Sequence, residues 1–279
     1  DVYLINTCTV TNIADRKSRQ MLHRARKLNP DAVVVATGCY VQTSPDRAIA
    51  DDAIDICIGN NRKNAIIEIV EEHLSKIEEQ KLAGDTDSAN KEIKTEDIID
   101  IGSTDISVGY EDMLLTDTAE RVRAYIKIQD GCNQFCSYCA IPLARGRVRS
   151  RRRESILDEI KGLTEKGFKE FVLTGIHISS YGMDFIDRNS EDYLGNKDVR
   201  DLAMKKEYLL NLIKEVANIE GVKRIRLGSL EPRIITDRFA SKLAGIEKIC
   251  PHFHLSMQSG CDETLKRMNR HYTCEEYMS

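Results

Sequence analysis

Short apolar runs alternate with stretches of helical amphipathic spacing along most of this 279-residue chain, and this alternation limits the folds open to it. In the first part, apolar runs at residues 2–6, 32–37 and 54–58 alternate with helical patterns at 14–28 and 65–77. Apolar runs of this length are typical of buried strands, and apolar residues three and four positions apart are typical of helices that pack on a sheet. The pattern predicts a parallel α/β domain.

A second pattern of the same kind begins at residue 122. We expect helices at residues 155–166, 208–217, 235–244 and 262–268, and strands at residues 124–128, 171–173, 222–227 and 252–257. Residues 183–206 are polar, and we expect a loop insertion there. The pattern holds roughly four β-α units, which are too few for a closed barrel of eight and predict a partial β/α barrel.

The segment between the two patterns, residues 80–118, is rich in Asp, Glu, Ser, Thr and Gly and has little periodicity. We interpret it as an interdomain linker with one short strand near residues 98–101. The predicted organisation is a first domain at residues 1–79, the linker, and a second domain at residues 119–279. The sequence starts inside a strand-like run and ends at a helix-like start, so we expect a chain cut short in both domains.

Nine cysteines occur in a chain with a formal net charge of −4. An odd count in a long chain without a visible signal peptide does not suit a secreted disulfide framework. We therefore expect a cytoplasmic protein with reduced thiols, some of them buried in the core and some binding metal. No run of about 18 apolar residues is present, so we expect no membrane span.

Three cysteines follow the first strand of the second pattern with the spacing Cys132-x-x-x-Cys136-x-x-Cys139. Three thiolates at this spacing can bind three irons of a 4Fe-4S cluster, which leaves the fourth iron without a protein ligand. The alternative is zinc, which usually takes four ligands in paired C-x-x-C form, and no fourth ligand lies nearby in the sequence. We favour the cluster, because the spacing resembles that of radical S-adenosylmethionine (SAM) enzymes, in which SAM chelates the fourth iron through its amino and carboxylate groups.

Cys8 and Cys39 each fall just past the end of a predicted strand in the first domain. Because the carboxyl ends of parallel strands meet at one edge of a sheet, both cysteines can lie at that edge and bind a ligand together. The alternative is two buried thiols that bind nothing. Cys57 lies inside its predicted strand, and we expect it in the core.

Six arginines stand among the nine residues from Arg145 to Arg153. Guanidinium groups suit phosphate oxygens, and this run directly follows the cysteine motif, where an RNA backbone would pass. We expect RNA contacts from Arg149, Arg151 and Arg152; the alternative is a solvated face beside a helix start.

Eight short motifs stand in a characteristic order along the chain. They are Ile5-Asn-Thr-Cys-Thr-Val-Thr-Asn12, Ala14-Asp-Arg-Lys-Ser-Arg-Gln20, Thr37-Gly-Cys-Tyr40, Asp130-Gly-Cys-Asn133, Leu173-Thr-Gly175, Ser229-Leu-Glu-Pro232, His252-Phe-His-Leu255 and Gln258-Ser-Gly260. In this order the chain resembles the methylthiotransferases of the radical SAM superfamily, over nearly its whole length except residues 80–118 and 183–206.

The resemblance implies SAM and two 4Fe-4S clusters. Cys132, Cys136 and Cys139 would hold the catalytic radical SAM cluster. Cys8 and Cys39 match two of three ligands of an auxiliary cluster, and the third belongs to a segment upstream of this sequence. The positions that the resemblance places near SAM are Gly175, Ser229, Glu231 and Gln258, although each could instead be a turn or cap residue.

The resemblance also implies a substrate. The motifs around Cys8 look most like those of the branch that modifies N6-threonylcarbamoyladenosine beside the anticodon of tRNA. In that reaction one SAM methylates a sulfur on the auxiliary cluster, and another supplies the radical that takes hydrogen from carbon 2 of adenine. The implied partners are tRNA and a low-potential electron donor such as flavodoxin or ferredoxin. The alternatives are isopentenyladenosine or a ribosomal protein as substrate, or a non-catalytic iron-sulfur or RNA-binding fragment.

Overall fold

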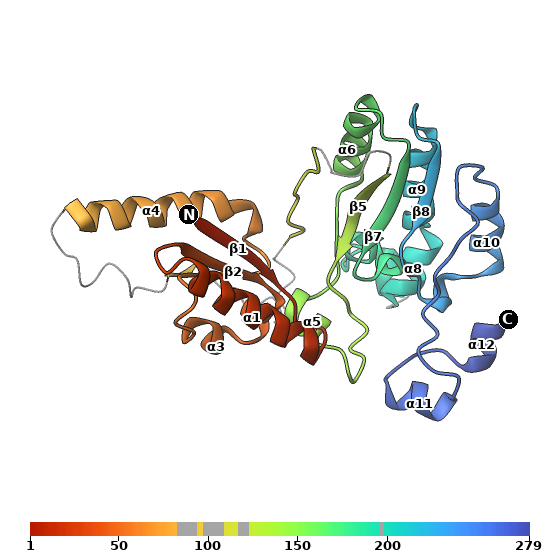
Figure 1. Ribbon diagram of the computed structural model, residues 1–279. Coiled ribbons are helices and arrows are strands. Elements are labelled where there is room, and N and C mark those ends of the chain that lie inside the picture. Colours follow the sequence, from red (N-terminus) through yellow and green to blue (C-terminus); the bar gives the residue numbers. More distant parts are fainter. Residues whose placement is uncertain (83–93, 97–108, 117–122, 196–197) are drawn as a thin grey trace. The chain divides into compact units, whose positions relative to one another are not determined.

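The computed structural model describes residues 1–82, 94–96, 109–116, 123–195 and 198–279 (Figure 1). The described residues form two compact units. We call them the N-terminal unit (Asp1–Glu111 and Cys139–Gly146) and the C-terminal unit (Asp112–Tyr138 and Arg147–Ser279). The expected strand at residues 98–101 lies outside the described residues.

The N-terminal unit is built on a parallel sheet with the strand order β1-β2-β3-β4. The strands are β1 (Val2–Thr7), β2 (Val33–Gly38), β3 (Ile56–Ile58) and β4 (Lys94–Glu96). The first three confirm the predicted strands, and β4 lies within the predicted linker segment. All three strand pairs are parallel, so the predicted parallel α/β fold is confirmed.

Helices cover both faces of this sheet (Figure 1). The helices α1 (Asn12–Leu28), α2 (Cys39–Thr43) and α3 (Pro45–Ile49) pack on one face, against Val34 and Ala36 of β2. On the other face, Ile69 of α4 (Ile66–Leu82) packs with Val33 and Val35. Because β2 is buried on both faces, its sequence is an unbroken apolar run rather than an alternating one. Helix η1 (Lys63–Ala65) precedes α4, and α5 (Ile141–Arg145) packs on α2.

The C-terminal unit is built on a sheet with the order β6-β5-β7-β8. Its strands are β5 (Arg123–Asp130), β6 (Arg149–Ser150), β7 (Glu170–Gly175) and β8 (Arg224–Leu227). Strands β5, β7 and β8 are parallel, and the short β6 pairs antiparallel with β5. The helices α6 (Arg153–Glu165), α9 (Tyr208–Asn218) and α10 (Asp237–Ala244) contribute to its single apolar core. The predicted partial β/α barrel is therefore confirmed.

The predicted loop at residues 183–206 is wrong, because this segment is largely helical. It holds η3 (Met183–Phe185), α7 (Glu191–Gly195) and α8 (Val199–Lys205). Helix α8 forms because Asp198 caps it, accepting from the N–H groups of residues 200 and 201 at 2.9 and 3.1 Å. Its apolar residues Leu202 and Ala203 are buried, which holds this polar segment against the rest of the unit.

The predicted strand at residues 252–257 is also wrong in extent. Only Leu255 forms a bridge, to Leu230, and a second isolated bridge joins Ile249 to Ile225. Pro251 directly precedes the segment and has no N–H to donate to a ladder. The remaining short helices are η2 (Ile178–Ser180), η4 (Pro232–Ile234), α11 (Asp262–Arg267) and α12 (Cys274–Met278). Among the described residues, no helix is both long and apolar enough to cross a bilayer.

Candidate functional site

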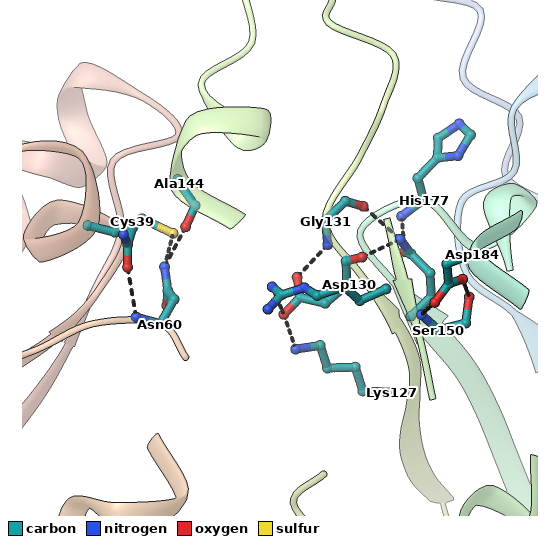
Figure 2. A network of polar contacts seen from close by, with 12 residues as sticks. Cys39, Asn60, Lys127, Asp130, Gly131, Ala144, Ser150, His177 and Asp184 are labelled. Atoms are coloured by element: carbon teal, nitrogen blue, oxygen red, sulfur yellow. Dashed lines mark hydrogen bonds and ion pairs between the residues drawn. The ribbon is translucent and has the colours of Figure 1, made fainter. Parts of the chain in front are cut away.

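The loop that carries Cys132 and Cys136 begins at a turn that follows directly on β5. Gly131 has a φ of 71°, a left-handed conformation that favours glycine. Its N–H donates to one carboxylate oxygen of Asp130 at 2.8 Å, and Lys127 Nζ donates to the other at 2.5 Å (Figure 2). The cysteine loop, residues 131–139, therefore starts from a hydrogen-bonded turn at the carboxyl end of the strand.

A buried glutamine joins the start of this loop to the end of β7. Gln129 Nε2 donates to the carbonyl oxygens of Asp130 and Gly131 at 2.6 Å each, and Gln129 Oε1 accepts from the N–H of His177 at 2.7 Å. A Cβ at Gly175 would come within 2.7 Å of the Gln129 carbonyl oxygen, so this position requires glycine. Close packing against Gln129 therefore explains why residue 175 is glycine.

The cysteines of the motif suit an iron-sulfur cluster by donor chemistry. Cys132 and Cys136 are each 9% exposed, and Cys139 is half-buried. Within the described residues, no three His, Cys, Asp or Glu side chains lie close enough together to hold one metal ion. Arg270 lies close enough to Cys136 for the sulfur to raise the pKa of the Arg270 guanidinium. The fit to the group therefore rests on the donor set, because three thiols at this spacing are the ligands that an iron-sulfur cluster takes.

The end of α11 and the residues after it, 267–270, hold the cysteine loop through its backbone, and we call them the loop brace. Ser137 donates its N–H to the carbonyl of Met268 at 3.2 Å and its hydroxyl to the carbonyl of Arg267 at 2.9 Å. Asn269, with a φ of 57°, donates its side-chain amide to the carbonyls of residues 134 and 135 at 3.3 and 3.0 Å. No sequence pattern pointed to the brace, because about 130 residues separate these partners.

Tyr138 links the cysteine loop to Gln258, one of the residues expected near SAM. The Tyr138 hydroxyl donates to Gln258 Oε1 at 3.0 Å and accepts from Arg270 Nη2 at 2.6 Å. Burial alone would lower the pKa of Arg270, but the Tyr138 hydrogen bond and the Cys136 sulfur raise it. Gln258 has a φ of 66°, so its backbone is held in an unusual conformation for a residue with a side chain.

Glu231, another residue expected near SAM, is the centre of a buried polar cluster. Its carboxylate lies 3.2 Å from Arg200 Nη2, 3.2 Å from Arg233 Nε and 3.5 Å from His177 Nε2. Gln134, from the cysteine loop, donates to the same carboxylate at 3.5 Å. Burial alone would raise the pKa of Glu231, but the hydrogen bond with His177 and the charge of Arg200 outweigh it and lower the pKa. Glu231 is thus ionised beside the cysteine loop.

Ser229, the remaining residue expected near SAM, is exposed and pairs with a histidine. Its hydroxyl lies 2.8 Å from Nδ1 of His254. The structure therefore connects two of the sequence motifs, the one that starts at Ser229 and the one that contains His254, at the carboxyl end of β8.

The arginine run divides between inside and outside the C-terminal unit. Arg151 is only 2% exposed and pairs with Glu159 and, at 2.7 Å, with Asp112. Arg149 is buried with its Nη2 4.0 Å from Asp130, whereas Arg152 is exposed. The expected RNA contact of Arg151 stays a prediction, and its burial argues against it, because its charge is compensated within the unit. Sequence alone could not separate these positions, since the run has no strand-like or helix-like pattern.

Cys8 and Cys39 occupy equivalent places at the carboxyl edge of the N-terminal sheet. Thr7 and Gly38, the residues before them, are register partners in the parallel pair β1–β2, so the expected shared edge is confirmed. Cys39 is buried and begins α2, whereas Cys8 is exposed. Gly38 has a φ of 105°, and a Cβ there would clash with the carbonyl oxygen of Thr7. Cys57 is fully buried within β3, as predicted.

Asn60, which the sequence did not single out, joins Cys39 to the segment that follows Cys139. Its side-chain amide nitrogen lies 3.8 Å from Cys39 Sγ and donates to the carbonyl of Ala144 at 2.7 Å (Figure 2). Gln42 Oε1 accepts from the Asn60 N–H at 3.0 Å. Asn60 is buried just past the end of β3, so it belongs to the same sheet edge as Cys8 and Cys39.

Two family models match the chain. The model described as "Radical SAM superfamily" matches residues 126–279, and the model described as "Uncharacterized protein family UPF0004" matches residues 1–59. The first covers the cysteine loop and the second covers the sheet edge with Cys8 and Cys39.

Similar proteins are named as tRNA-modifying enzymes. The chain is 40% identical over 277 residues to the threonylcarbamoyladenosine tRNA methylthiotransferase MtaB of Aquifex aeolicus (strain VF5), covering 99% of this chain and 58% of that protein. The protein of the same name from Bacillus subtilis (strain 168) is 38% identical, with 99% and 53% covered. A tRNA-2-methylthio-N(6)-dimethylallyladenosine synthase of Finegoldia magna is 32% identical, with 100% and 53% covered. The chain therefore spans little more than half the length of these relatives.

A solved structure shares the fold. The radical S-adenosylmethionine methyltransferase TsrM from Kitasatospora setae, solved with cobalamin and a [4Fe-4S] cluster bound, matches with a TM-score of 0.60 at 18% identity. The match covers 99% of this chain and 54% of that chain. At this identity the likeness concerns the fold alone.

Proposed function

Because this chain belongs to the radical SAM superfamily, and because its relatives are named as methylthiotransferases, we propose that it belongs to an enzyme that methylthiolates tRNA. The proposed reaction adds a methylthio group to carbon 2 of N6-threonylcarbamoyladenosine beside the anticodon. The identities of 40% and 38% with two proteins named for that nucleoside support this substrate. tRNA reads mRNA codons in the cytoplasm, so the proposal includes that compartment.

The observation that carries the proposal is the cysteine loop. It begins at a hydrogen-bonded turn after β5, and the loop brace holds its middle by the backbone. The thiols of Cys132, Cys136 and Cys139 would hold a 4Fe-4S cluster whose open iron binds SAM. When bound, this pair supplies a 5′-deoxyadenosyl radical for hydrogen abstraction. A loop fixed at both its start and its middle suits this task, because radical chemistry requires the reacting groups to be held in place.

Of the residues expected near SAM, Glu231 and Gln258 contact this loop. Gly175 packs on Gln129 at the end of the neighbouring strand, and Gln258 accepts from Tyr138 of the loop. Ser229 and Glu231 follow β8, and Glu231 contacts Gln134 of the loop. We propose that these four positions border the SAM site. Only Gly175 has a role that packing alone explains.

Cys8 and Cys39 would hold two irons of an auxiliary cluster, the sulfur carrier of the proposed reaction. Their equivalent places past β1 and β2 support this role, because both thiols leave the sheet at the same edge. The buried amide of Asn60 beside Cys39 Sγ suits a sulfur ligand, since hydrogen bonds to sulfur tune iron-sulfur clusters. Reduction of either cluster requires a low-potential donor such as flavodoxin or ferredoxin.

The burial of Arg151 changes which arginines are candidates for RNA contact. Arg152 is exposed and remains a candidate for phosphate contact, whereas Arg149 faces Asp130. Arg147 lies over the ring of Phe135, with 4.3 Å between the guanidinium carbon and the ring centroid. This cation–π contact supports the proposal that Arg147 contacts RNA near the reacting base.

A second candidate substrate is isopentenyladenosine in tRNA. The 32% identity to a protein named for dimethylallyladenosine favours it over a protein substrate. It ranks second, because the two proteins at 40% and 38% identity are both named for threonylcarbamoyladenosine.

Mass spectrometry of tRNA nucleosides tests the proposal. The nucleosides would be compared between a strain lacking the full-length gene, the same strain with the gene restored, and a strain restored with Cys132→Ala. We expect 2-methylthio-threonylcarbamoyladenosine only with the intact gene. Methylthio on isopentenyladenosine instead would make the second candidate correct, and an unchanged nucleoside profile would exclude a tRNA substrate.

A further inference from the structure

The polar cluster around Glu231 carries more positive charge than its carboxylate needs. Arg200 and Arg233 both contact this carboxylate at 3.2 Å, and the charge of Arg270 also acts on it. Two guanidinium groups thus contact one buried carboxylate. An excess of partly buried cations is costly unless an anion accompanies it, so the cluster suits an anionic ligand.

Arg200 uses only part of its guanidinium in this cluster. Its Nη2 contacts Glu231, whereas its Nη1 is buried and meets no hydrogen-bond acceptor anywhere in the described part of the chain. A guanidinium presents parallel N–H groups that match the two oxygens of a carboxylate. Glu231 holds the Nη2 side of the guanidinium in place, which leaves the Nη1 side for a second carboxylate.

The cluster lies where a substrate would be recognised. Gln134, between Cys132 and Cys136, donates to Glu231 at 3.5 Å, so the cluster adjoins the cysteine loop. Arg200 comes from α8, in the segment between β7 and α9, and Glu231 follows β8. These segments leave the carboxyl ends of parallel strands, the edge at which α/β proteins bind ligands.

We propose that Arg200, held by Glu231 and assisted by Arg233, binds the carboxylate of the threonyl group on the modified adenosine. This inference rests on the proposed function. The threonylcarbamoyl group carries a carboxylate, whereas the isopentenyl group is a hydrocarbon, so this contact distinguishes the two nucleosides. A site built to pair with an anion rejects an analogue that lacks it, because the cation is then left unpaired.

The carboxylate of SAM is the other candidate ligand of the same chemistry. In a radical SAM site that carboxylate is bound by the open iron of the cluster, as the sequence motif implies. A second receptor for it is therefore unnecessary. The threonyl carboxylate has no such partner, which favours it as the ligand of Arg200.

The test compares two anticodon stem-loop RNAs on the reconstituted full-length holoenzyme. One RNA carries threonylcarbamoyladenosine, and the other carries its methyl ester, which removes the negative charge. We expect the wild type to bind the acid RNA roughly 10- to 100-fold more tightly than the ester, the range of a charged hydrogen-bonded pair. Arg200→Gln should reduce this preference to about 2-fold or less by weakening only the acid complex. Arg200→Lys, which keeps the charge but loses the fork, should give an intermediate preference.

Arg188→Gln is the matched control, because Arg188 is an exposed arginine of the same segment. It should keep the full preference for the acid RNA. The inference is overturned if Arg200→Gln also keeps that preference, or if it weakens both RNAs equally. It is also overturned if Arg200→Gln lowers the affinity for SAM without RNA, because Arg200 would then bind the SAM carboxylate. Failure of the proposed function gives a different result. In that case the wild-type enzyme methylthiolates neither of the two RNAs, or it methylthiolates an RNA with isopentenyladenosine instead.

Discussion

The side-chain amide nitrogen of Asn60 lies 3.8 Å from the sulfur of Cys39 within the N-terminal unit. The same nitrogen donates to the carbonyl of Ala144 in α5, the helix that follows Cys139. One buried amide therefore contacts the sulfur of Cys39 and also holds the backbone of the segment that follows the cysteine loop.

Replacement of Asn60 by leucine should destabilise the protein, because the buried Ala144 carbonyl would lose its donor. We expect a loss of about 1–3 kcal/mol in the free energy of unfolding. Urea denaturation followed by circular dichroism measures it. Asn12→Leu, at an exposed amide of the same unit, serves as the control and should change the stability by less than about 0.5 kcal/mol. Equal stability of Asn60→Leu and the wild type would contradict the role of this amide.

Removal of the Asn269 amide should loosen the cysteine loop. Asn269→Gly keeps the left-handed backbone relaxed while it removes both hydrogen bonds to the loop. We expect less iron and sulfide per chain after reconstitution, because a mobile loop presents its thiols less well. Asn218→Ala, an exposed position on α9, should keep the wild-type iron content. Full iron content in Asn269→Gly would show that the brace is not needed for metal binding.

The carboxylate of Glu170 should make the free energy of unfolding fall as the pH becomes acidic. Burial alone would raise its pKa, but Arg226, Arg224 and Arg123 lower it from 4.5 to about 2. Because the pKa is lower in the folded state, the stabilisation is complete above about pH 4.5 and is lost as the pH falls towards 2.

Glu170→Gln should therefore cost about 1–3 kcal/mol at pH 7, since its three arginine partners are partly exposed. The difference from the wild type should shrink as the pH falls below about 4.5. Urea unfolding at a series of pH values measures this, with Glu220→Gln at an exposed position as the control. A difference that stays constant down to pH 2 would sink the electrostatic explanation.

Arg151 should act on stability rather than on RNA. Its removal leaves Glu159, which is also buried, without its guanidinium partner. We expect Arg151→Leu to cost about 3–5 kcal/mol in the free energy of unfolding. Glu159 also accepts from the Leu115 N–H at 2.7 Å, so the loss should extend to the segment before β5. Hydrogen exchange at Leu115 would report this, and unchanged exchange would contradict the link.

Arg152 should show the opposite behaviour. It is exposed, so Arg152→Gln should leave the stability within about 0.5 kcal/mol of the wild type. If it contacts a phosphate, the variant should bind tRNA more weakly, and the slope of log affinity against log salt should fall by about 1. Binding isotherms at several salt concentrations measure the slope. An unchanged slope would remove Arg152 from the RNA interface.

Much of the fold follows from the sequence by local rules. The apolar residues of β1, β2, β3, β5, β7 and β8 are read from the chain itself. Strands β2 and β3 are buried along their whole length, whereas apolar residues alternate with charged ones in parts of β5 and β8. The placement of Cys8 and Cys39 also follows, since residues past the ends of parallel strands share an edge. Where local rules failed, the cause was tertiary. Helix α8 has a polar sequence, and the burial of Leu202 and Ala203 within the unit adds to the capping by Asp198.

The sequence by itself determined the strand–helix order and the three-cysteine spacing, because both depend on neighbouring residues. Only the tertiary structure decided which polar side chains meet. It buried Arg151 while it exposed Arg152. It also brought Asn269 to the cysteine loop from about 130 residues away and Arg200 to within 3.2 Å of Glu231. These contacts depend on packing between distant segments, and no local periodicity encodes them.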